Sequence, residues 1–168
     1  MTASSEQRPH TPASWSHRLL AFLATWGPAL AIMAIIFRLS SDPDLGGPGW
    51  VTALAYRLLG GWAGLARFDP LLALADRYIS WGAHFTFYAA LALALLWALR
   101  RQWPGLRHPA WTAWLLTTLY GVSDEWHQSF VPHRAPDWRD VATDMAGAAV
   151  ALGVVWAARR WWGGRRTR

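Results

Sequence analysis

Residues 123–144 read SDEWHQSFVPHRAPDWRDVATD. This stretch holds five carboxylates, two histidines, two arginines and one glutamine, in a chain that is 54% hydrophobic. It lies between two apolar segments, so the chain must place these charges at one end of a membrane bundle or inside it. Ionisable groups at membrane depth are costly and persist there mainly as paired, cavity-facing groups. The stretch therefore favours an integral membrane fold and marks the place where a functional site is expected.

The apolar residues gather into blocks of membrane-spanning length rather than spreading periodically, as they do in a soluble domain. Three blocks are strong candidates for spans: residues 19–37, 81–99 and 137–158. Residues 110–122 are apolar but short, and they reach spanning length only if the helix continues through the polar turn to Phe130. That turn must then face the protein interior or the interface. The sequence thus predicts an all-α membrane bundle of four transmembrane helices.

The longest connection, residues 40–80, is interrupted by glycine and proline turns. Two stretches inside it, residues 50–59 and 71–78, are expected to form short helices on the bilayer surface in the first outer loop. A fifth span over residues 51–66 is the weaker alternative, because Arg57 and the paired glycines interrupt it. The sequence alone leaves that alternative open.

The domain organisation is one transmembrane domain with a tail at each end. Residues 1–16 are polar and lack apolar periodicity, so we expect a disordered cytoplasmic tail. Residues 17–158 form the transmembrane domain, and residues 159–168 form an arginine-rich cytoplasmic tail that suits anionic lipid. With four spans and both termini inside, ten arginines and one acid lie in the cytoplasm, against six arginines and nine acids outside. This loop asymmetry predicts that the polar stretch faces outward.

Composition narrows the function classes. The net charge of +6 comes from arginines in loops and tails rather than on one amphipathic face, which favours membrane topology over nucleic-acid binding. Many of the 14 tryptophans lie at block ends, as interfacial anchors do, so membrane lipid is the expected partner. The absence of cysteine excludes disulfides, thiolate catalysis and cysteine-based zinc sites.

Helix geometry and topology together bring polar side chains towards one outward-facing pocket. Asp124, His127 and Gln128 share one helix face, and His84 starts its span at the same outer level. The side chains expected to converge are His84, Tyr88, Asp124, His127, Arg134, Asp140 and Asp144.

The residues leave three interpretations open. The first is a polar network that stabilises the bundle, and the second is a pocket in which Arg134 binds the phosphate or carboxylate of an amphiphile. The third is a hydrolase or transferase site that uses a metal or a general base. The order Asp-Glu-x-His does not match the zinc motif His-Glu-x-x-His, so we assign no metal ligand and no catalytic residue, and no cofactor is identified.

Three runs carry a family resemblance: YGVSDEWHQ at 120–128, FVPHR at 130–134, and the pattern D-V-x-x-D-x-x-G at 140–147. Together with the earlier pair His84 and Tyr88, they resemble the VanZ-like family over about residues 19–158. The resemblance implies a small multi-spanning membrane protein of the bacterial envelope. The family is named for a protein that lowers susceptibility to teicoplanin, a lipid-tailed glycopeptide antibiotic.

The resemblance also supplies candidate ligand-binding residues: His84, Tyr88, Ser123, Asp124, Glu125, His127, Gln128, Arg134, Asp140 and Asp144. Gly147 completes the last motif. Two positions depart from the family pattern, since the family often has Asn at Asp144 and a basic residue at Trp81.

The leading interpretation is therefore a cell-membrane protein that binds or handles an amphiphilic envelope molecule, such as a lipid-linked glycan or a lipid-tailed glycopeptide. Lowered glycopeptide susceptibility is a consequence that the resemblance implies. Whether the chain is an enzyme, and in what oligomeric state it exists, are left undecided by the sequence.

Overall fold

The computed structural model describes residues 14–43, 49–59 and 65–165. The elements in these ranges are all helical, which confirms the all-α class there. They are α1 (Trp15–Ser40), α2 (Trp50–Leu58), the short 3-10 helix η1 (Leu65–Phe68), α3 (Asp69–Gln102), α4 (Pro109–Gln128) and α5 (Trp138–Arg165). Most of the expected N-terminal tail, residues 1–13, lies outside the described residues.

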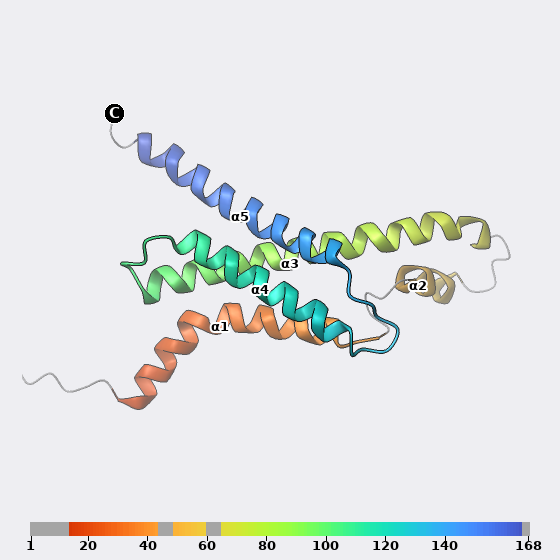
Figure 1. The fold of residues 1–168 in the computed structure, drawn as a ribbon, viewed down its shortest axis with the longest axis horizontal. Helices are drawn as coiled ribbons and strands as arrows, with labels where there is room; N and C mark the ends of the chain where they lie inside the picture. Colours follow the sequence, from red (N-terminus) through yellow and green to blue (C-terminus); the bar gives the residue numbers. More distant parts are fainter. Residues whose placement is uncertain (1–13, 44–48, 60–64, 166–168) are drawn as a thin grey trace, which may run out of the picture.

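Helices α1, α3, α4 and α5 lie side by side and alternate in chain direction (Figure 1). Helix α3 is central, because it contacts α1, α2, α4 and α5. The alternation brings the end of α1, the end of α4 and the start of α5 together, and we call this the acidic end of the bundle. The opposite end, where α3 finishes, α4 begins and α5 finishes, is the arginine end.

Among the described residues, three helices are long and apolar enough to cross a membrane: α1, the continuous stretch Ala66–Gln102 that contains α3, and α5. Helix α4 has 20 residues, about 30 Å at 1.5 Å per residue, but it falls short on apolar composition. Its last two turns, which include Asp124, Glu125 and His127, explain that shortfall. The regular elements of the described residues are thus all helical and include three candidate spans, and the fourth predicted crossing stays a prediction.

The prediction of a separate helix at the start of α3 is wrong. Residues 71–78 were expected to form a separate interfacial helix, but they are the first turns of α3, which has 34 residues and is about 51 Å long. Pro70 lies in the first turn of α3, and residues 71–80 contain no glycine or proline, so nothing stops the helix before the apolar block that begins at Trp81. The first part of α3 therefore projects beyond the other helices at the acidic end (Figure 1).

The helix expected over residues 50–59 is present as α2, and it packs against the projecting part of α3. Its nine residues cover about 14 Å, too short to cross a membrane, so within the described residues α2 is no fifth span. Buried Asp76 of α3 accepts hydrogen bonds from the Val51 backbone N–H (2.6 Å) and the Thr52 hydroxyl (3.0 Å). A carboxylate at a helix N-terminus stabilises it, so Asp76 fixes α2 on α3.

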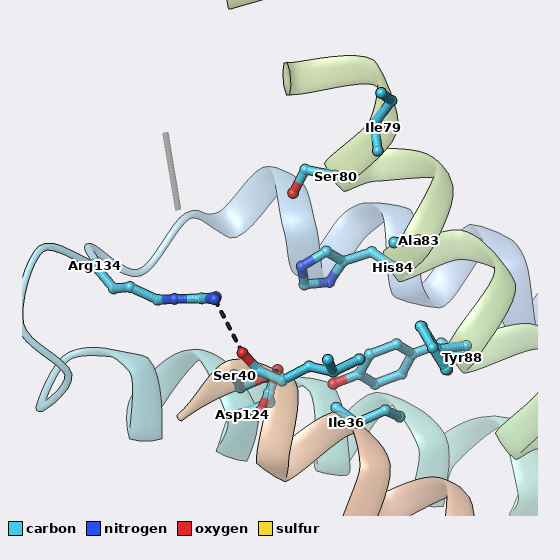
Figure 2. Close-up of a pocket in the computed structure, with 11 residues that line it drawn as sticks. Ile36, Ser40, Ile79, Ser80, Ala83, His84, Tyr88, Asp124 and Arg134 are labelled. Atoms are coloured by element: carbon cyan, nitrogen blue, oxygen red, sulfur yellow. Dashed lines mark hydrogen bonds between the residues drawn. The ribbon is translucent and has the colours of Figure 1, made fainter. Parts of the chain in front are cut away.

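Helix α4 continues through the polar turn, as predicted, but it ends at Gln128, two residues before the predicted end at Phe130. Asp124, Glu125 and Gln128 are buried, so the prediction that this turn faces the protein is confirmed. Figure 2 draws Asp124 of this turn together with Ser40 of α1 and His84 of α3, which line the same pocket.

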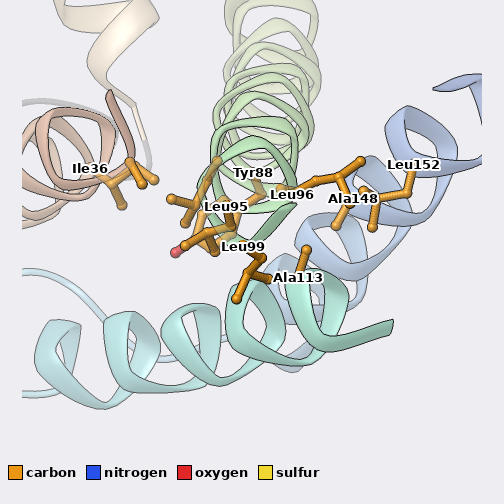
Figure 3. Close-up of a cluster of buried hydrophobic side chains, with 11 residues drawn as sticks. Ile36, Tyr88, Leu95, Leu96, Leu99, Ala113, Ala148 and Leu152 are labelled. Atoms are coloured by element: carbon orange, nitrogen blue, oxygen red, sulfur yellow. The ribbon is translucent and has the colours of Figure 1, made fainter. Parts of the chain in front are cut away.

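The apolar core surrounds α3. Figure 3 looks along α3, with α1, α4 and α5 around it, and shows Leu96 towards Ala148 of α5 and Leu99 towards Ala113 of α4. Many large apolar side chains outside this cluster are exposed, among them Trp156, which is 63% exposed. A soluble monomer rarely exposes so much contiguous apolar surface, whereas a bundle in lipid does. The small core and apolar exterior agree with a membrane protein.

Arginines stack on tryptophans at the arginine end. The guanidinium of Arg101 lies 5.6 Å from the ring centroid of Trp97, and that of Arg160 lies 5.6 Å from the ring of Trp156. Tryptophan and arginine near helix ends anchor a helix at the membrane interface.

Candidate functional site

His84 of α3 is the centre of the polar cluster at the acidic end. Its Nδ1 lies 3.0 Å from Oδ1 of Asp144 on α5, and Asp144 is fully buried. A carboxylate accepts hydrogen bonds, so with Asp144 ionised the proton of a neutral His84 ring lies on Nδ1, and Nε2 lies on the other side of the ring. The ring also lies parallel to that of Tyr88, with ring centroids 6.1 Å apart. These contacts fix the orientation of the imidazole.

Two carboxylates face the Nε2 side of His84. Oδ2 of Asp140 lies 3.9 Å from Nε2, and one oxygen of Glu125 completes a group of three atoms that all lie within 4.8 Å of one another. Glu125 is held by Nε2 of Gln128 (3.1 Å) and by the backbone N–H of Asp137 (2.8 Å). Three helices, α3, α4 and α5, thus contribute one group each.

A second network lies beside this cluster, around Asp124. Its Oδ2 accepts hydrogen bonds from the Ser40 hydroxyl (2.9 Å) and from Nε2 of Gln128 (3.1 Å). Gln128 therefore links the two networks, because it donates to Glu125 as well. Its own oxygen accepts from Nη1 of Arg134 at 3.3 Å.

Arg134 connects the loop after α4 to the end of α1. Its Nη2 donates to the backbone carbonyls of Leu39 and Asp42, at 3.1 Å each. Burial lowers the pKa of the Arg134 guanidinium, and the nearby carboxylates of Asp124 and Glu125 oppose that shift. An arginine stays charged under such a shift, so Arg134 is a fixed positive charge beside the carboxylates.

The structure does not bring every predicted residue into the cluster. His127 turns towards α1, where its Nε2 lies 3.0 Å from the Ser41 hydroxyl and its ring stacks on Phe37 at 4.6 Å. Ser123 is exposed, and its hydroxyl donates to the Tyr120 carbonyl at 2.7 Å. The two histidines of the motifs, His84 and His127, therefore lie in separate environments.

Two neighbouring cavities border the cluster. The first has a volume of about 220 Å³ and is mainly apolar (Figure 2). Its lining residues are Ile36, Leu39, Ser40, Ile79, Ser80, Ala83, His84, Phe87, Tyr88, Asp124 and Arg134. The second, of about 660 Å³, is more polar and includes Trp81, Gln128, Asp137 and Asp140. Ser80 and Arg134 line both cavities.

Sequence reasoning missed the contribution of α1. Ser40 and Ser41 follow the first span and were interpreted only as the start of a loop, yet they bind Asp124 and His127. The alternation of the spans was the one signal that places them level with the end of α4. Asp76 was missed as well, because nothing in the sequence shows that α2 folds back onto α3.

The fold and the site together define a class: helical-bundle membrane proteins with a buried polar cluster at one end of the bundle. A sequence profile of the VanZ/LLP1 family matches residues 25–159, and the chain belongs to this family. The match includes all of the residues described above for the two networks. No curated protein and no solved structure matches the chain.

Proposed function

We propose that the chain is a multi-pass protein of the bacterial cell membrane that binds an amphiphilic envelope molecule in a pocket open to the outer leaflet. Lipid-linked glycans and lipid-tailed glycopeptides are the ligand classes we favour. One observation carries the proposal: an apolar cavity adjoins a polar one, and the cationic Arg134 lies on the border of both.

The pocket has the two halves that an amphiphile needs. Ile36, Ile79 and Phe87 offer an apolar surface to a lipid chain, and the polar cavity offers hydrogen-bonding groups to a headgroup. Binding sites of this kind combine an apolar lining with a few placed polar groups. Arg134 is the group suited to a phosphate or carboxylate, since guanidinium binds such anions in a fork geometry. The projecting turns of α3, with α2 packed on them, form a wall beside this pocket.

The orientation is part of the proposal. We place α4 across the membrane, with the acidic end outside and both termini in the cytoplasm. The length of α4 matches the hydrocarbon thickness, and its polar last turns face α1 and α5 rather than lipid. The arginines at the opposite end then lie in the cytoplasm, in keeping with the positive-inside rule.

A filled cavity tests the proposal without disturbing the polar networks. Ala83 is exposed on α3 and lines the apolar cavity, so Ala83→Phe obstructs it. The matched control is Ala149→Phe, at an exposed position on α5 outside both cavities. Purified protein is incubated with a polyprenyl phosphate or with the corresponding polyprenol, and the bound lipid is measured by native mass spectrometry.

We expect the wild type and Ala149→Phe to retain the phosphate lipid, whereas Ala83→Phe loses it and the polyprenol binds weakly to all three proteins. A parallel measurement expresses the three chains in a teicoplanin-susceptible bacterium, where the wild type and Ala149→Phe raise the inhibitory concentration. The proposal is contradicted if Ala83→Phe retains the phosphate lipid as the wild type does and also gives the same inhibitory concentration of teicoplanin. The polar networks would then have only a structural role.

A further inference from the structure

From the donor geometry we infer that His84, Glu125 and Asp140 form a binding site for one divalent transition cation, zinc or manganese, with Asp144 as the residue that orients His84. This inference stands apart from the proposed amphiphile, because it depends only on the cluster itself.

The donor atoms suit such a cation. One ring nitrogen of His84 and one oxygen each of Glu125 and Asp140 lie within 4.8 Å of one another, and Nε2 is the ring nitrogen that lies near Asp140. Ligands bound to one tetrahedral cation at 2.0–2.2 Å lie roughly 3.3–3.6 Å apart. The 3.9 Å between His84 Nε2 and Asp140 Oδ2 is close to that spacing, so small rotations of the carboxylates complete the site.

The contact behind His84 is the second observation. Metal-bound histidines almost always donate their other ring N–H to a carboxylate or a carbonyl, which fixes the tautomer and makes the free nitrogen a better ligand. Here Nδ1 is 3.0 Å from buried Asp144, and Nε2 faces the two remaining carboxylates. The second oxygen of Asp144, Oδ2, is also buried without a hydrogen-bond partner among the described residues. A cation on Nε2 increases the positive character of the ring and so stabilises the Asp144 carboxylate.

The charges of the cluster call for a cation as well. Glu125, Asp140 and Asp144 place three carboxylates around a single imidazole, and the charge of Arg134 offsets only part of the charge of Glu125 and Asp140. Burying several carboxylates without compensation is strongly unfavourable. Either bound protons or a bound cation must remove that cost, and the donor set favours the cation.

The donor set also selects among cations. One imidazole with two carboxylates suits zinc or manganese, whereas magnesium and calcium prefer oxygen ligands alone. The side chains of His84 and Asp140 are 14% and 19% exposed, so an ion can enter from the polar cavity that Asp140 lines. Three protein ligands leave at least one coordination position for water or for an oxygen of a phosphate headgroup.

Metal titration of the full-length protein tests the inference. The protein is purified in detergent, stripped with a chelator, and titrated with zinc, manganese or magnesium by calorimetry, with metal content checked by mass spectrometry. We expect one equivalent of zinc or manganese, at least tenfold weaker binding for Asp140→Asn, and little or no binding for His84→Ala. Asp69→Asn, an exposed acid outside the cluster, is the control and keeps the wild-type affinity.

Asp144 gives an independent arm of the test. Asp144→Leu removes the acceptor for Nδ1 and is expected to weaken binding 10- to 100-fold, whereas Asp144→Asn keeps an acceptor oxygen and costs less. A metal-free melting temperature of Asp140→Asn equal to that of the wild type shows that the loss is not caused by unfolding, and zinc then raises the melting temperature of the wild type alone. The inference is overturned if no stoichiometric zinc or manganese binds. It is equally overturned if Asp140→Asn binds as the wild type does, or if magnesium binds as tightly as zinc.

Discussion

Substitution of Gly147 by alanine tests how α5 is seated on α3 beside the site. A Cβ atom at Gly147 would collide with the backbone carbonyl of Phe85, the residue that follows His84. Backbone in the middle of a helix cannot rotate away as a side chain does, so the two helices must separate. The matched control is Gly153→Ala on the same helix, where a Cβ atom meets nothing within 4 Å.

The two variants share one favourable term and differ in one unfavourable term. Alanine is favoured over glycine inside a helix by about 1 kcal/mol, and that gain applies at both positions. Overpacking costs about 1–3 kcal/mol, and it applies only at Gly147. The free energy of unfolding should therefore be about 1–3 kcal/mol lower for Gly147→Ala than for Gly153→Ala. At about 2–4 °C per kcal/mol, the melting temperature is lower by roughly 2–12 °C.

Thermal unfolding in detergent, followed by circular dichroism, measures the difference. We also expect Gly147→Ala to weaken the binding of zinc, because moving α5 separates Asp140 and Asp144 from His84. Equal melting temperatures for the two alanine variants would refute the close approach of α5 to α3, and with it the geometry of the cluster.

Two further substitutions test other parts of the structure. Asp76→Ala removes the acceptor for the Val51 backbone N–H, so we expect α2 to lose about 1 kcal/mol of local stability. Hydrogen exchange should then be faster over residues 51–58 and unchanged in the rest of the bundle. Exchange unchanged over α2 would contradict this role. Arg134→Lys keeps the positive charge but loses the guanidinium, which donates hydrogen bonds to Gln128, Leu39 and Asp42. Each lost hydrogen bond costs about 1 kcal/mol, so the melting temperature should fall by a few degrees. A lysine variant as stable as the wild type would show that the charge alone matters.

Much of the site was predictable because membrane burial is restrictive. The short apolar block before Asp124 could reach spanning length only by including the polar turn, so burial of Glu125 and Gln128 followed from the sequence. The convergence of His84 and Asp140 followed from alternating spans, which place both near the same end.

The remainder depends on contacts between helices that no sequence period encodes. His127 shares a helix face with Asp124 by spacing, and both side chains contact the end of α1, where Asp124 binds Ser40 and His127 binds Ser41. The spacing does not show that His127 thereby lies away from His84. The sequence of residues 71–78 is compatible with an interfacial helix and with the extension of a span. Only the absence of a helix-breaking residue before Trp81 distinguishes the two. Glu125 was predicted as a ligand-binding residue, but its place beside His84 became evident only from the packing of α4 against α3.

The central claim is that the acidic end of the bundle is exposed on the outer side of the membrane. The chain has no cysteine, so single cysteines can be labelled without background. Ser129 follows α4 and Gly105 precedes it, and both are exposed. In spheroplasts treated with a membrane-impermeable maleimide, we predict that Ser129→Cys is labelled at once and Gly105→Cys only after permeabilisation. Labelling of both cysteines from one side, or the reverse order, would contradict the crossing of α4 and the outward-facing site.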